Sequence, residues 1–138
     1  MSSWIAIDQD RIDRFACVSG DDGFIHVDPV AAAVTPFGTT IAHGQLLLSL
    51  TGAMGKEVLP AITDRAHLLN YDCDRVRLLS PVSVRSRVRG RYRLDEAVER
   101  SAKERGIIRA ILGGRAEHRW GWGKLPTCGH RAIDAIHP

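Results

Sequence analysis

The chain has 138 residues, 44% of them hydrophobic and 25% charged, with a net charge of +3 at pH 7. This composition is typical of a globular protein with a real core and excludes a disordered polymer, so we expect a single domain over residues 1–138. The longest apolar run, around residues 46–50, is too short to span a bilayer, and the first ten residues lack a secretory signal. Three scattered cysteines favour reduced thiols in a cytoplasmic protein over a disulfide framework.

Charge is distributed unevenly along the chain. Residues 1–74 carry four Lys/Arg and ten Asp/Glu, whereas residues 75–119 carry thirteen Lys/Arg and five Asp/Glu. A basic half is compatible with a polyanionic partner such as nucleic acid, a membrane surface or a phosphorylated small molecule. A solvated, arginine-rich face explains the same pattern, and on charge alone we favour that interpretation.

The first 35 residues predict a short strand and two helices. Residues 4–7 (WIAI) have the composition of a strand, and Asp8 or Asp10 is placed to cap a helix that ends at Gly20. After the stretch GDDGFIHVDP, Asp28 is placed to cap a short helical turn that begins at Pro29.

The middle of the chain predicts a buried helix from residue 42 to about residue 59. It is apolar on nearly every side, yet it is too short for a membrane, so we expect it to be buried in the core. We expect Pro60 to end it.

Residues 82–94 alternate strictly between apolar or small residues and polar ones, mostly arginines. This pattern predicts a long antiparallel strand with one solvent-exposed face. Valines, small residues, Tyr92 and Leu94 share one face, whereas arginines at positions 85, 87, 89, 91 and 93 share the other. Residues 68–82 predict one or two strands before it, and residues 97–102 and 106–112 predict further sheet. The simplest architecture is α+β, a central helix wrapped by a curved antiparallel sheet.

Three segments in order, FACVSGDDGFIHVDP, PFGTTIAHGQLLLSL and NYDCDRVRLLSPVSVRSRVRG, resemble the MaoC-like (R)-specific enoyl-CoA hydratase family of hot-dog fold proteins, closest to the branch that includes nodulation protein N. The resemblance covers roughly residues 4–100. It implies a homodimer and an enzyme, a hydro-lyase that reversibly adds water to a trans-2-enoyl-CoA without a cofactor or a metal. It also implies that Asp21 and His26 are the catalytic pair and that the backbone N–H of Gly44 is the oxyanion donor.

These assignments agree with the chemistry that hydration requires. Water needs a base to take its proton and an acid to deliver one to the substrate, and a carboxylate and an imidazole that share one water do both. Negative charge on the thioester oxygen is stabilised by a backbone N–H at a helix N-terminus, where Gly44 should lie. A glycine there lets the substrate approach the backbone closely.

Two features depart from the family. The family usually carries an amide residue two positions after the catalytic Asp, followed by Pro or Trp, whereas this chain has Gly23 and Phe24. Residues 113–138 lack clean alternation and are rich in Gly, His and Trp, so we expect a tail from about residue 103 to 138 that is atypical of the fold. Our hypothesis is that a shifted reading frame after Ala102 replaced the native last strands, which translation of the DNA in the other frames would test.

Alternative interpretations remain for the individual residues. Asp21 also suits an ordinary Gly-Asp turn, and a single histidine such as His26 or His43 is more often structural than catalytic. Cys128, His130 and His118 lack the spacing of a zinc site. The whole chain could be a catalytically weak or inactive hot-dog protein that binds acyl thioesters. The arginine face could bind nucleic acid, although we expect neither a nucleic-acid nor a membrane partner.

Overall fold

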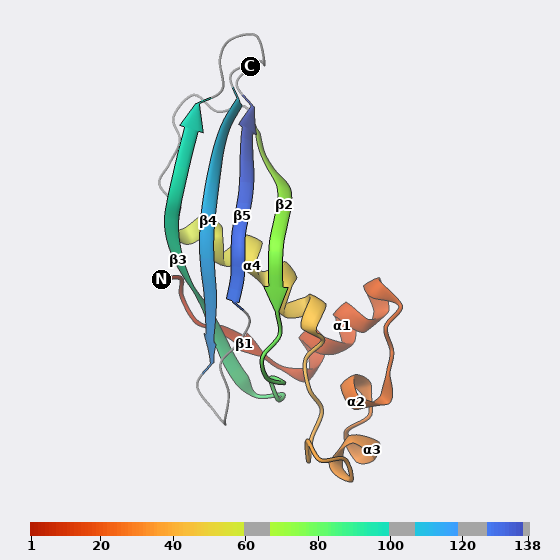
Figure 1. Cartoon of the computed structure of the whole chain (residues 1–138). Helices are drawn as coiled ribbons and strands as arrows, with labels where there is room; N and C mark the ends of the chain where they lie inside the picture. The colour runs from red at the N-terminus through yellow and green to blue at the C-terminus, as the bar shows by residue number, and fades with distance from the viewer. Residues whose placement is uncertain (60–66, 100–106, 119–126, 137–138) are drawn as a thin grey trace.

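The computed structural model describes residues 1–59, 67–99, 107–118 and 127–136, and this part of the chain forms an antiparallel sheet packed against helices. The strands are β1 (Ile5–Ile7), β2 (His67–Arg77), β3 (Ser86–Glu99), β4 (Ile107–His118) and β5 (Thr127–Ile136), in the order β1-β3-β4-β5-β2. The helices are α1 (Gln9–Ser19), α2 (Phe24–Val27), α3 (Pro29–Ala33) and α4 (Gly44–Val58). Figure 1 shows α4 lying across one face of the long strands, with α1, α2 and α3 gathered near its N-terminal end. The α+β prediction is confirmed, and within the described residues no helix is both long and apolar enough to cross a bilayer.

The predicted helix ends are confirmed for α1 and α3. The Asp8 side chain accepts a hydrogen bond from Arg11 N at the start of α1, and Gly20 ends this helix in the left-handed conformation with φ 75°. The Asp28 side chain accepts from two backbone N–H groups at the start of α3, whose first residue is Pro29. Each cap satisfies helix-end groups that otherwise have no partner, so the chain direction is fixed on both sides of residues 20–28.

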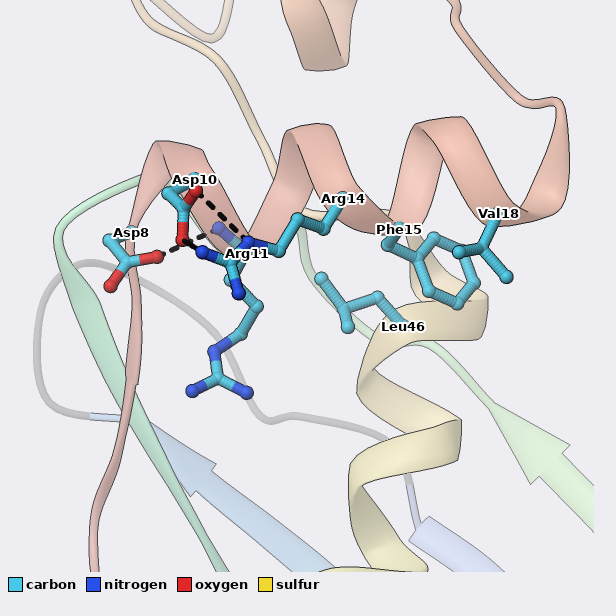
Figure 2. A pocket seen from close by; sticks show the side chains of 7 residues that line it. All are labelled: Asp8, Asp10, Arg11, Arg14, Phe15, Val18 and Leu46. Atoms are coloured by element: carbon cyan, nitrogen blue, oxygen red, sulfur yellow. Dashed lines mark hydrogen bonds and ion pairs between the residues drawn. The ribbon is translucent and has the colours of Figure 1, made fainter.

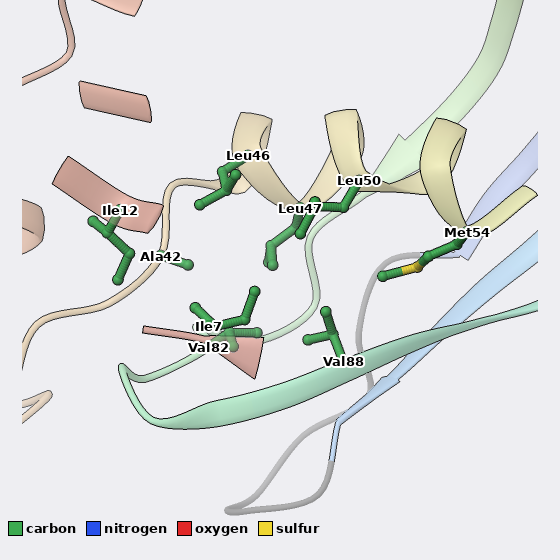
Figure 3. Packing of buried hydrophobic residues seen from close by; sticks show 9 residues of the cluster. All are labelled: Ile7, Ile12, Ala42, Leu46, Leu47, Leu50, Met54, Val82 and Val88. Atoms are coloured by element: carbon green, nitrogen blue, oxygen red, sulfur yellow. The ribbon is translucent and has the colours of Figure 1, made fainter. Parts of the chain in front are cut away.

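Helix α4 supplies the centre of the core. Leu46, Leu47, Leu50 and Met54 form its buried side and face residues of β1, the approach to β3 and β3 itself, as Figure 3 shows. The rest of the cluster consists of Ile7, Ile12, Ala42, Val82 and Val88. We predicted that α4 is buried on nearly every side. In the single chain this is wrong, because the side of α4 that faces away from the core, which includes Ala53, is exposed. The predicted stop at Pro60 lies outside the described residues.

Strand β3 keeps the predicted two faces but begins later than predicted. Ser83 forms an isolated bridge with Ile41, and a turn closed by Ser86 N donating to Ser83 O separates it from β3. Arg85 occupies this turn with φ 67°, a conformation that non-glycine residues rarely adopt. Beyond the turn, Ser86, Val88 and Gly90 are buried, while Arg87, Arg91 and Arg93 are exposed.

The tail contributes two strands to the sheet. Strand β4 pairs with β3 on one side and β5 on the other, and β5 also pairs with β2, all antiparallel. Residues 107–118 and 127–136 of the tail are therefore paired in the sheet, and the expectation that the tail is atypical of the fold family stays a prediction. Register shifts between Leu112 and Gly114 and between Asn70 and Asp72 accompany this pairing, and such irregularities break the period-two pattern by which strands are recognised.

Candidate active site

The candidate site is built on the loop between α1 and α3, residues 20–28, which includes α2. Its two ends are fixed by the Gly20 and Asp28 caps. Its middle is held by Gln9, whose Nε2 donates to the backbone oxygen of His26 at 2.8 Å. The Gln9 Oε1 in turn accepts from the hydroxyl of buried Thr40 at 2.6 Å. One side chain from the first turn of α1 therefore ties this loop to the segment that leads into α4.

His26 is half-buried and its ring orientation is fixed. Its Nδ1 lies 2.7 Å from the backbone oxygen of Ile41, and because a carbonyl only accepts, Nδ1 carries the hydrogen. The backbone repeats this pairing, since Ile41 N donates to Ile25 O at 3.0 Å. The other nitrogen, Nε2, is consequently the one left to exchange a proton with a bound molecule.

Asp21 is exposed at the start of the same loop. Its backbone N donates to Ser19 Oγ at 3.3 Å, and its backbone oxygen accepts from His43 Nε2 at 2.8 Å. One carboxylate oxygen of Asp21 and one ring nitrogen from each of His26 and His43 lie within 4.8 Å of one another. The structure thus brings the predicted pair, Asp21 and His26, into one small polar site and adds His43 to it.

Gly44 is the first residue of α4, as predicted, and its N–H belongs to the helix turn that has no intrahelical acceptor. The expected reason for a glycine here, a close approach of the substrate, stays a prediction, and the structure adds a packing neighbour. A Cβ at this position would collide with Leu78 Cδ1 and lie 3.4 Å from its Cγ. Leu78 therefore occupies the space that a side chain would take, and because Leu78 is half exposed, its flexible end must move to admit a Cβ here.

Gly23 lies between the two predicted catalytic side chains. A Cβ at this position would lie 3.7 Å from Asp21 Oδ1 and 3.7 Å from His26 Cδ2, both ordinary contacts. Its φ of −51° suits any residue. An amide side chain would hence start between the carboxylate and the imidazole, and this chain lacks it. The neighbouring departure, Phe24, opens α2 and is exposed.

The same three side chains, Asp21, His26 and His43, have the atom types of metal ligands. However, the imidazoles of His26 and His43 are stacked, with centroids 3.8 Å apart and planes inclined by 25°. Ring lone pairs lie in the ring planes, so those of two stacked rings do not converge on one ion. In addition, His26 Nδ1 and His43 Nε2 already bind backbone oxygens. This arrangement suits an acid–base site better than a zinc centre.

A separate pocket of about 360 Å³ lies along α1 and is drawn in Figure 2. Phe15 and Val18 on α1 and Leu46 on α4 form its apolar part, and Asp8, Asp10, Arg11 and Arg14 line the rest. Arg14 is paired with Asp10 at 2.9 Å. Phe15 links the pocket to the candidate site, because its ring centroid lies 5.0 Å from that of His43.

A long helix wrapped by an antiparallel sheet, with a polar site at the helix N-terminus, defines a hot-dog fold. The (R)-hydratase from A. caviae involved in PHA biosynthesis shares it with a TM-score of 0.77 and 23% identity, over 99% of this chain and 92% of that one. R-hydratase PhaJ1 from Pseudomonas aeruginosa, in the unliganded form, has a TM-score of 0.74 and 25% identity, over 100% of this chain and 80% of that one. The hot-dog prediction is confirmed.

Residues 1–111 match the model of the MaoC like domain, and the chain belongs to the MaoC-like dehydratase family. Nodulation protein N from Rhizobium leguminosarum bv. viciae is 53% identical over 102 residues, which is 73% of this chain and 63% of the relative. The 3-hydroxyacyl-thioester dehydratase Z of Mycobacterium tuberculosis (strain ATCC 25618 / H37Rv) is 42% identical over 88 residues, 64% of this chain and 58% of that protein. The matches thus span less than two thirds of these relatives' own lengths.

Two residues of the site were not predicted from the sequence. Gln9 carried no motif, and His43 was interpreted only as a residue that packs or hydrogen-bonds at the helix start. A signal for His43 was present, because a histidine directly before the helix glycine is placed to reach whatever the helix N-terminus faces. No comparable signal marked Gln9, whose hydrogen bonds to the loop and to Thr40 reach residues 17 and 31 positions away.

Proposed function

We propose that this protein is an (R)-specific hydratase or dehydratase of acyl thioesters that adds water to a trans-2-enoyl-CoA. One observation carries the proposal: the Asp21 carboxylate and the His26 imidazole share a small site beside the first turn of α4. The names of its relatives support it, since they include a 3-hydroxyacyl-thioester dehydratase and (R)-hydratases.

In this proposal Asp21 and His26 act on one water molecule. As the water oxygen bonds to C3 of the enoyl group, its proton passes to the base, and the C2–C3 π electrons move toward the thioester carbonyl. The enolate then takes a proton at C2 to give the 3-hydroxyacyl thioester. The hydrogen bond from His26 Nδ1 to Ile41 O directs Nε2 toward this exchange, and the exposed Asp21 carboxylate lies beside it.

The Gly44 N–H is proposed to receive the negative charge that develops on the thioester oxygen. Its place in the first turn of α4 leaves it without an intrahelical acceptor, and the helix dipole adds to its positive potential. Loss of one such donor typically costs about 2.7–4 kcal/mol of barrier stabilisation.

The test follows the decay of the enoyl-thioester absorbance with crotonyl-CoA, in the parent chain and in Asp21→Asn. Asp22→Asn is the matched control, because it removes the adjacent exposed carboxylate by the same substitution. We expect decay in the parent and in the control, and a loss of at least about 10²-fold in Asp21→Asn, the lower end of what one acid–base group contributes. Equal rates in all three proteins would refute the role of Asp21.

A second candidate is a thioester-binding protein with weak or no turnover. The empty position at Gly23, directly between Asp21 and His26, favours it, because the side chain that usually stands there is absent. Calorimetric titration with butyryl-CoA, a saturated ligand that cannot react, distinguishes the two. Binding of butyryl-CoA together with no decay of crotonyl-CoA in a folded parent would support this second function.

The active form is proposed to be a homodimer, as the family resemblance implies. Three large apolar side chains around α2 and α3, Phe24, Val30 and Val34, are exposed in the isolated chain, and a second copy would cover such a surface. Light scattering coupled to size exclusion would measure the mass in solution. A monomer mass at micromolar concentration would refute the homodimer.

A further inference from the structure

His43 is a buried polar residue at the junction of the candidate site. It is 1% exposed and precedes the first residue of α4, where its side chain makes no helix-capping hydrogen bond. A histidine in this position has two donor or acceptor atoms to satisfy, and an unsatisfied buried polar atom destabilises the fold. Its contacts therefore indicate what it contributes in return.

The first contact is with Asp21. His43 Nε2 lies 2.8 Å from the backbone oxygen of Asp21, and because that oxygen only accepts, Nε2 carries the hydrogen and donates. The two residues are 22 positions apart, so this bond joins the start of α4 to the start of the loop that carries the carboxylate. It restrains the backbone of Asp21, whose side chain is exposed and has no core packing to hold it.

The second contact is with His26. The two imidazoles are stacked with centroids 3.8 Å apart, and the Phe15 ring packs on His43 with its centroid at 5.0 Å. His43 Nδ1 is buried and has no hydrogen-bond partner among the described residues. The ring plane is hence held by its neighbours on α1 and α2, and its rotation within that plane is set by the single bond to Asp21.

We propose that His43 is a positioning residue that holds Asp21 and His26 at a fixed separation, so that both reach the same water. This inference rests on the proposed function and extends it to a residue that does not itself exchange protons with the substrate. One ring restrains the backbone of Asp21 by its edge and the imidazole of His26 by its face.

Two variants separate the two contacts. His43→Gln keeps an N–H donor near the position of Nε2 but lacks a ring, whereas His43→Phe keeps a ring and lacks the donor. Val88→Ala is the stability control, because it removes volume from the core on β3, a strand that supplies none of the named site residues. The measurements are kcat and KM for crotonyl-CoA, the melting temperature, and deuterium exchange of backbone amides in residues 20–28.

We expect His43→Phe to lower kcat on the order of 10²-fold with little change in KM, since a displacement of about 1 Å of a reacting group has that effect. Deuterium exchange in residues 20–28 should become faster in His43→Phe, whereas His43→Gln should recover much of the kcat and of the exchange protection. Val88→Ala should lower the melting temperature and leave kcat and loop exchange near the parent values.

Unchanged loop exchange in a folded His43→Phe overturns the inference, and so does a kcat that falls equally in Val88→Ala. If the parent does not turn over crotonyl-CoA, the proposed function fails. Deuterium exchange in residues 20–28 then decides by itself whether His43 restrains this loop. In that case, faster exchange in His43→Phe that His43→Gln reverses supports His43 as the residue that holds the loop.

Discussion

The packing of Leu78 against Gly44 predicts a strong energetic coupling between these two residues. An added Cβ in Gly44→Ala would overlap Leu78 Cδ1, so the Leu78 side chain must rotate away. Leu78 is 49% exposed, so about half of its side chain is buried, and this half is what the rotation exposes to water. Because full burial of a leucine contributes about 1.5–3 kcal/mol, we expect the displacement to cost about 1 kcal/mol.

A gain in stability opposes this cost, because replacing a glycine in a helix by alanine usually raises the free energy of unfolding. Alanine is favoured over glycine in a helix by about 0.5–1 kcal/mol, partly because the unfolded chain loses conformational freedom. Gly44→Ala alone should therefore change the free energy of unfolding by less than about 0.5 kcal/mol. In the background of Leu78→Ala, where the obstruction is gone, the same substitution should stabilise the protein by about 0.5–1 kcal/mol.

Urea denaturation of the parent, the two single variants and the double variant measures this coupling, which we expect to be about 1 kcal/mol. A coupling below about 0.3 kcal/mol, the range of independent sites, would refute the reasoning. Turnover of crotonyl-CoA in the same four proteins tests the function of the glycine. We expect Leu78→Ala to relieve any loss caused by Gly44→Ala, whereas a loss that persists would mean that the Cβ obstructs the substrate.

The remaining predictions concern Gly23 and Arg85. Gly23→Asn should raise kcat/KM for crotonyl-CoA by up to about tenfold, the equivalent of one hydrogen bond, because its Cβ would lie between Asp21 and His26. Gly23→Ala, which adds the Cβ without the amide, is the control, and an equal gain in both variants would contradict a role for the amide. Arg85→Gly should raise the free energy of unfolding by about 0.5–1 kcal/mol in urea denaturation, since it removes a left-handed non-glycine residue. Arg87→Gly, within β3, should lower it, and the same sign for both arginines would count against strain at the turn.

Features of the fold that depend only on residues close together in the sequence, such as helix ends, were predictable from the sequence. Asp8, Gly20 and Asp28 end helices through bonds to backbone groups within a few positions, so their residue types and spacing suffice. The start of β3 was missed because the turn before it places an arginine, Arg85, where glycine or asparagine would have given a signal. The first half of β4 was predicted as sheet, but the register shift between Leu112 and Gly114 interrupts the alternation, so the rest of the strand was missed.

The candidate site divides in the same way. Asp21 and His26 are five residues apart on one capped loop, but the local sequence alone suits an ordinary turn, and the resemblance carried by three segments was needed to propose them. The contacts that orient them come from Gln9, Ile41 and His43, and each depends on how α1 and α4 pack in three dimensions. Residue types alone do not define such contacts, because many sequences with the same local motif could place other side chains there.

His43 and Gly44 are consecutive, and this places two separate requirements of the proposed reaction on one rigid element. His43 restrains the loop that carries Asp21 and packs on His26, while Gly44 offers its N–H at the first turn of the same helix. The start of α4 therefore restrains one member of the acid–base pair and supplies the oxyanion donor from two consecutive residues. The reaction requires a fixed mutual geometry of these groups, whereas the position of the site relative to the rest of the protein matters less.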